Sequence, residues 1–176
     1  MGGTETLSID RTTQDGLFTE AASTFGPALS RIARAYEADP EIRRDLLQDI
    51  HLHLWRSLSH FDRRCSLRTW THRVAHNVAT SHVIRQRRLR DSLVTIEDIE
   101  SMPDAAAPDR AALDLATLIQ RLKPLDRQII VSYLEGIDAA ATADITGLSP
   151  ANVAMKIHRI KAILKRWFLE GAPDVD

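Results

Sequence analysis

The residues of this chain with the clearest capacity for chemistry are arginines and lysines gathered in two stretches. Residues 63–90 contain eight arginines and no acid, and residues 145–169 contain five Lys or Arg residues and again no acid. Residues 1–62 hold ten acids against six bases, and residues 91–114 hold seven acids against one base, although the net charge is only -1. Clustered cationic side chains are suited to binding phosphates. The pattern therefore favours two polyanion-binding surfaces over two helix faces that are merely solvated.

Other patterns that could support chemistry are weak. His72 and His76 stand four residues apart, but no Cys-x-x-Cys or His-Glu-x-x-His motif accompanies them, so we predict no metal site. The sequence shows no phosphate-binding glycine loop, no catalytic-triad pattern and no carboxylate pair, and we expect neither an enzyme nor a bound cofactor. The single cysteine, Cys65, excludes a disulfide within one chain and fits a reducing compartment.

The composition predicts a soluble, all-α protein. Hydrophobic residues make up 44% of the chain and charged residues 27%, whereas aromatic residues are only 5%. Ala, Leu and Arg are the commonest types, and all three favour helices. No apolar run approaches the ~20 residues needed to span a bilayer, and the N-terminus lacks a basic-then-apolar signal pattern. We expect a cytoplasmic protein with no direct membrane insertion.

Hydrophobic spacing and helix-start signals predict two small helical domains joined by an acidic flexible linker. Residues 1–15 are expected to be disordered, 16–90 to form the first domain, 91–109 the linker, 110–170 the second domain and 171–176 a tail. In the first domain we expect helices at about 17–36, 40–58 and 66–88. Asp39-Pro40 and Ser149-Pro150 combine an N-cap residue with proline at the first helical position. The third helix is expected to bury one stripe, formed by Leu67, Trp70, Val74, Val78 and Ser81.

Residues 138–166 have the order of a helix-turn-helix motif, in which the second helix enters the major groove of DNA. A short helix at 138–145 precedes the turn Thr146-Gly147-Leu148, and a longer helix extends from 150 to about 168. At 100° per residue, the inward positions are Val153, Ile157, Ile160 and Leu164. The outward positions and their flanks, which would meet bases and phosphates, are Ser149, Ala151, Asn152, Met155, Lys156, His158 and Arg159. A helical hairpin used for protein contacts is the alternative.

Two sets of motifs resemble the sigma factors of bacterial RNA polymerase. Residues 45–55 (DLLQDIHLHLW), followed by Phe61-Asp62, 67–70 (LRTW) and 73–77 (RVAHN), resemble sigma region 2 in order and spacing. Residues 122–128 (LKPLDRQ), 133–136 (YLEG), 147–149 (GLS) and 156–159 (KIHR) resemble sigma region 4. The resemblance covers about residues 17–90 and 110–168. With only these two regions, the chain resembles the small, extracytoplasmic-function group.

The resemblance implies a sigma factor that binds core RNA polymerase and directs promoter recognition, DNA opening and transcription initiation at a specific set of genes. Contact with the polymerase clamp coiled coil is implied for Asp45, Gln48, Asp49 and Leu52, and a second contact is expected with the flap. Contact with the -10 element is implied for Phe61, Arg63, Arg64, Ser66, Trp70, Arg73, Asn77, His82, Arg85, Arg87 and Arg88. For Trp70, a buried core role and a DNA-wedge role stay open. The helix after Ser149 would read the -35 element.

The resemblance also implies an anti-sigma partner, in many family members at a membrane. The acidic linker would lie near basic polymerase channels, or it would mask the basic helices of the free protein. Two alternative functions follow from the residues alone. One is a helix-turn-helix transcription regulator that is not a polymerase subunit, and the other is a helical adaptor that binds polymerase and not DNA. The acidic and apolar face at 45–55 favours the sigma factor over the first, and the basic last helix favours it over the second.

Overall fold

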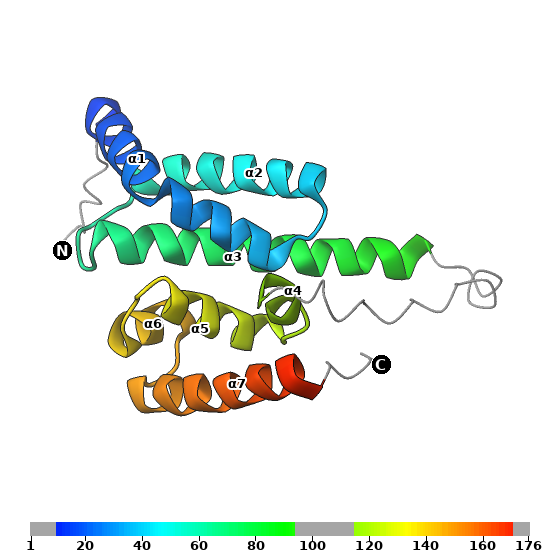
Figure 1. The fold of residues 1–176 in the computed structure, drawn as a ribbon. Coiled ribbons are helices and arrows are strands. Elements are labelled where there is room, and N and C mark those ends of the chain that lie inside the picture. The colour runs from blue at the N-terminus through cyan, green and yellow to red at the C-terminus, as the bar shows by residue number, and fades with distance from the viewer. Residues whose placement is uncertain (1–9, 94–114, 171–176) are drawn as a thin grey trace, which may run out of the picture.

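The structure, a computed structural model, describes residues 10–93 and 115–170. The described residues form helices and no strand, which confirms the all-α prediction. The first domain holds α1 (Arg11–Tyr36), α2 (Pro40–Leu58) and α3 (Leu67–Leu93). The second holds α4 (Leu115–Gln120), α5 (Pro124–Leu134), α6 (Ala139–Thr146) and α7 (Pro150–Glu170), and it packs below α1 and α3 in Figure 1.

The helices are stacked in layers. Among the described helices, α2 contacts only α1 and α3, and α7 contacts only α4, α5 and α6. The two domains meet where α1 and α3 pack against α4, α5 and α6. The outermost layers, α2 and α7, therefore lie on opposite sides of the molecule.

Helix α1 begins earlier than the sequence suggested. Residues 11–15, expected to be disordered, are helical, because the Asp10 side chain accepts a hydrogen bond from the Thr13 amide at 2.9 Å. Gln14 is buried and donates to the Trp55 carbonyl at 2.6 Å, and the Trp55 indole donates to Asp15 at 2.8 Å. These contacts join the first turns of α1 to α2. Pro27 lies inside α1 without ending it.

Helix α2 has the predicted bounds. Asp39 caps it by accepting from the amides of Glu41 and Ile42, at 2.8 and 3.0 Å, and Pro40 occupies the first position. Residues spaced four apart form one stripe of this helix and are almost fully buried: Leu46, Ile50, Leu54 and Leu58. Burying each such side chain contributes about 1.5–3 kcal/mol.

Helix α3 buries a different stripe from the predicted one. Ser81 is exposed, and the other expected positions are only half-buried: Leu67, Trp70, Val74 and Val78. The buried residues of its central part are instead small or polar: Thr71, His72, Ala75, His76 and Ala79. The reason is that α3 is covered on two sides, by α1 and α2 and by α5 and α6. A single amphipathic stripe does not describe a helix packed in this way.

The second domain follows its local signals closely. Asp138 caps α6 by accepting from the Ala141 amide at 2.7 Å. Gly147 ends α6 with φ 75°, a left-handed conformation that glycine adopts without a steric penalty. Ser149 then accepts from the Asn152 amide at 3.3 Å at the start of α7. The predicted linker lies mostly outside the described residues, as does the predicted tail.

Candidate nucleic-acid interface

The outer face of α7 carries the residues expected to read duplex DNA. Val153, Ile160 and Leu164 are buried, as the helical spacing predicted, whereas Ile157 is only half-buried. The residues on the other side are exposed: Ser149, Ala151, Asn152, Met155, His158 and Arg159. Met155 is an apolar residue with 66% of its surface exposed. Lys156 differs, because it is half-buried and its ammonium group lies 2.8 Å from the Asp126 carboxylate.

An apolar groove that sequence reasoning missed lies between α5 and α7. Its volume is about 410 Å³, and it is lined by Tyr133, Gly136, Ile137, Asp138, Ala139, Ala154 and Ile157. The Lys161 ammonium lies 5.2 Å from the centre of the Tyr133 ring, at one side of the groove. The groove residues come from two stretches of the chain, 133–139 and 154–157, that meet only in the folded domain, so no single sequence motif marks the groove.

Trp70 belongs to the packing of the first domain. Its ring lies 5.3 Å from that of Phe61, which is buried, and its indole donates to the Ser57 hydroxyl at 3.0 Å. The Arg73 guanidinium lies 6.0 Å from the Trp70 ring. These contacts hold the half-buried indole from three sides and favour a packing role over a free wedge.

The connection before α3 presents cations to solvent. Arg63 and Arg64 are exposed, and Arg63 has φ 61°, the only left-handed residue other than glycine in the described part of the chain. Asp62 accepts from the Arg64 amide at 3.1 Å. Ser66 accepts from the Thr69 amide at 3.0 Å, so its side chain caps α3. The loop is thus shaped by its own short-range hydrogen bonds.

The remaining residues expected to contact the -10 element divide into exposed and buried groups. Asn77 and Arg85 are exposed and line a groove of about 230 Å³ between α2 and α3, which Asp49 and His53 also line. Arg87 and Arg88 are exposed farther along α3. His82, by contrast, is buried, and its ring lies 2.9 Å from the Glu37 carboxylate. Phe61 and His82 therefore do not reach the surface.

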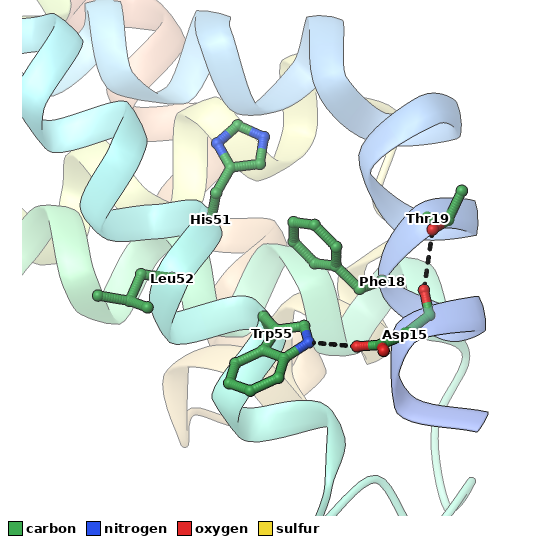
Figure 2. A pocket seen from close by; sticks show the side chains of 6 residues that line it. All are labelled: Asp15, Phe18, Thr19, His51, Leu52 and Trp55. Carbon is green, nitrogen blue, oxygen red and sulfur yellow. Dashed lines mark hydrogen bonds between the residues drawn. The ribbon is translucent and has the colours of Figure 1, made fainter. Parts of the chain in front are cut away.

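The exposed face of α2 holds the four residues expected to contact polymerase. Asp45 and Gln48 are exposed, Leu52 is 44% exposed, and Asp49 lies 3.7 Å from the Arg85 guanidinium. Leu52 also borders a groove of about 450 Å³ lined by Asp15, Phe18, Thr19, His51, Leu52 and Trp55. Figure 2 shows the two aromatic side chains entering this groove from facing helices, Phe18 from α1 and Trp55 from α2.

Two histidines at the contact between the domains were not recognised as structural. Burial lowers the pKa of His72 to about 4 and that of His76 to about 3, so both imidazoles are neutral at pH 7. The described residues contain no group of three His, Cys, Asp or Glu side chains that could hold a metal ion. The four-residue spacing that suggested metal ligands instead places both rings on the buried side of α3. Within the described ranges, no helix combines the length and hydropathy needed to cross a membrane.

Both halves of the chain match models of known protein families. Residues 22–89 match the model of sigma-70 region 2, and residues 112–164 match that of sigma-70 region 4. The chain belongs to the sigma-70 family. It is 26% identical over 143 residues to the ECF RNA polymerase sigma factor SigX of Bacillus subtilis (strain 168), covering 73% of this chain and 71% of the relative. As a sigma factor of the ECF type, it associates with RNA polymerase in promoter recognition and initiation.

A solved structure has the same fold as this sigma factor. It is the structure of CnrH in complex with the cytosolic domain of CnrY, with a TM-score of 0.63 and 21% sequence identity. The similarity covers 93% of this chain and 99% of that chain. It therefore extends through both helical domains of the ECF sigma factor.

Proposed function

We propose that this sigma factor uses three surfaces to initiate transcription: the outer face of α2 for core polymerase, the exposed part of α3 and its preceding loop for the -10 element, and the outer face of α7 for the -35 element. The observation that carries the proposal is the difference in charge between them, although the first two adjoin where Asp49 lies 3.7 Å from Arg85. The α2 face is acidic and apolar, whereas the other two surfaces are cationic and lie in regions 2 and 4.

The α2 face suits a basic partner that also has apolar side chains. Asp45, Gln48 and Asp49 offer carboxylates and an amide beside the exposed Leu52. The adjoining groove with Phe18 and Trp55 would accept an apolar side chain of the clamp (Figure 2). Complementary charge would orient the partner, and burial of the apolar groups would supply affinity.

The -10 surface would combine phosphate and base contacts. We assign phosphate contacts to the exposed arginines, Arg63, Arg64, Arg85, Arg87 and Arg88, because guanidinium groups bind phosphate in a bidentate manner. Asn77 is an exposed amide in the groove between α2 and α3 and would meet a base edge. Phe61, Trp70 and His82 would support this surface from within the domain.

The -35 surface would place α7 in the major groove. Asn152, His158 and Arg159 are the exposed polar side chains of its outer face. Asn and Arg pair with adenine and guanine respectively, and Met155 would contact a thymine methyl group. We assign the flap contact to the apolar groove between α5 and α7.

The decisive experiment is in vitro transcription with purified core polymerase and pooled genomic promoter fragments. The sigma factor should produce discrete new transcripts, and Asp49→Arg should abolish them by placing a cation on the acidic face. Glu20→Arg makes the same charge change at an exposed α1 position and should leave them unchanged. Footprints from the protein alone, without polymerase binding, would instead establish an ordinary helix-turn-helix regulator.

We also propose that an anti-sigma protein holds this sigma factor in the cytoplasm. The role of the sigma factor itself would be binding without catalysis. The similar CnrH structure is a complex with the cytosolic domain of CnrY, which supports the assignment. Co-purification from cells followed by mass spectrometry would identify the partner. Recovery of core polymerase alone, under conditions where the sigma factor is inactive, would contradict it.

A further inference from the structure

A polar pocket that the proposed function does not use lies between α1, the first turns of α3 and the end of α5. Its volume is about 420 Å³, which is enough to hold a small organic molecule. Its charged and imidazole groups belong to Arg31, Arg68, His72 and Glu135. None of the residues that line it is among those assigned above to polymerase or DNA, so the pocket has no role in the proposed function.

The pocket carries an excess of positive charge. Both oxygens of the Glu135 carboxylate accept hydrogen bonds from the Arg31 guanidinium, at 2.6 and 2.7 Å, so these two charges compensate each other. Arg68 donates to the Glu135 carbonyl, which is uncharged, and it forms no ion pair within the described residues. Two arginines against one glutamate leave a net charge of +1 at the pocket. Such a site favours an anion, because guanidinium N–H groups bind carboxylates and phosphates strongly.

Deep in the pocket lies a histidine with an unused ring nitrogen. His72 lines the pocket but is only 1% exposed, and its Nδ1 has no hydrogen-bond partner in the described part of the chain. Burial lowers the pKa of His72 to about 4, so the neutral ring offers one N–H donor and one acceptor nitrogen at pH 7. A buried polar atom without a partner costs free energy. An oxygen atom of a ligand would supply the missing hydrogen bond after a small turn of the ring.

The rest of the wall is mostly apolar. Phe25 of α1 is half-buried and Leu134 of α5 is 50% exposed, and both line the pocket. Pro27 and Ala28, also in the wall, have side chains too short to fill the space beside them. An aromatic ring would pack well against such residues. The wall therefore suits a molecule with an anionic group at one end and an apolar ring at the other.

We propose that this pocket binds a small organic anion that carries an aromatic ring. The phosphate or carboxylate of the ligand would accept hydrogen bonds from Arg68 and Arg31, and one oxygen would bond to the His72 ring. The aromatic ring would lie against Phe25 and Leu134. Since the unfolded chain has no such pocket, the ligand would stabilise the folded protein.

The first test measures binding of phenyl phosphate to the whole chain by isothermal titration calorimetry at low ionic strength. The parent protein should show one saturable site with a Kd of about 1 mM or tighter. Inorganic phosphate, which lacks the ring, should bind several-fold more weakly, and phenol, which lacks the charge, should give no saturable binding. Benzoate in place of phenyl phosphate would distinguish a carboxylate from a phosphate as the preferred anionic group.

Paired variants test whether the pocket is the site. Arg68→Gln should weaken binding of phenyl phosphate about tenfold or more, because it removes the uncompensated cation. Arg166→Gln makes the same change at an exposed position of α7 and should leave binding unchanged. Leu134→Asp places a negative charge at the pocket and should also weaken binding, whereas Leu169→Asp, at another exposed leucine, should not. Far-UV circular dichroism would show that each variant is folded.

Nuclear magnetic resonance of the ¹⁵N-labelled histidine rings would locate the bound molecule. Saturation with phenyl phosphate should shift the ring signals of His72, which are identified by their loss in His72→Gln, and not those of the exposed His53. Absence of saturable binding by the parent, equal weakening by Arg68→Gln and Arg166→Gln, or a bound state with unmoved His72 signals would overturn the proposal. These measurements involve neither polymerase nor promoter DNA, so the pocket could fail as a binding site while the proposed function stands.

Discussion

Lowering the pH from 7.5 to 5.0 is expected to remove about 4 kcal/mol from the free energy of unfolding through His72 and His76 alone. Both rings are buried, and burial holds their pKa values near 4 and 3 against an ordinary 6.5. The neighbouring His72 further lowers the pKa of His76. Around His72, Glu135 opposes the effect of burial, whereas Arg68 and Arg31 add to it.

The direction of this change in the free energy of unfolding follows from proton binding. Below pH 6.5 the unfolded chain protonates both histidines, whereas the folded chain keeps them neutral until the pH approaches 4. The stability that depends on the neutral rings is therefore complete above pH 6.5 and falls as the pH drops toward 4 and 3. Each histidine contributes about 1.4 kcal/mol per pH unit, or about 2 kcal/mol at pH 5.0.

Urea unfolding at the two pH values, followed by far-UV circular dichroism, measures the effect. The control is the double variant His72→Gln, His76→Gln, since every carboxylate that titrates in this range is common to both proteins. The parent protein should lose about 4 kcal/mol more than the double variant between pH 7.5 and 5.0. A difference below about 1 kcal/mol would refute the reasoning, because it would mean that the folded state accepts these protons.

Three further predictions concern packing, backbone conformation and DNA binding. Leu54→Ala, at a fully buried position, should cost about 2–5 kcal/mol in urea unfolding, and the half-exposed Leu52→Ala clearly less; equal costs would contradict the burial described. Gly147→Ala should cost about 1 kcal/mol, because the left-handed φ disfavours a Cβ although nothing lies within 4 Å of it; an unchanged melting temperature would argue against that conformation. Arg159→Ala should weaken binding to duplex promoter DNA. If Arg159 contacts a phosphate, the loss should also reduce the salt dependence of binding by about one ion. Binding titrations at several salt concentrations that match those of the parent would exclude Arg159 from the interface.

Local signals were sufficient where one residue or one face determines the structure. Asp39-Pro40, Gly147 and Ser149-Pro150 marked helix ends that the structure confirms, because capping acts within a few residues. The exposed face of α7 likewise followed from its periodicity, since only its inner side is covered. The early start of α1 was not predictable in this way. It depends on Gln14 and Asp15 binding Trp55, about 40 residues away.

In the candidate site, too, some features follow from local sequence signals and others depend on contacts between distant residues. The exposed residues of α2 and α7 followed from motif and spacing, and their surface positions agree with that reading. The buried position of His82 did not follow, because it depends on Glu37, the residue that follows α1. Helix α3 packs against α1 and α2 and also against α5 and α6, so its polar residues His72 and His76 lie inside. Burial at the contact between the two domains does not appear as a periodic pattern of hydrophobic residues in the sequence of either domain.

The position of α7 as an outermost layer has a kinetic consequence. Because it touches only α4, α5 and α6 among the described helices, its outer face is equally accessible whether the domains are together or apart. Weak, salt-sensitive contact with duplex DNA through this one helix requires no rearrangement, and such contact permits sliding and hopping along the duplex. In the proposed function, the search for a promoter and the commitment to it would be separate events, the first made by α7 alone and the second only when both domains engage.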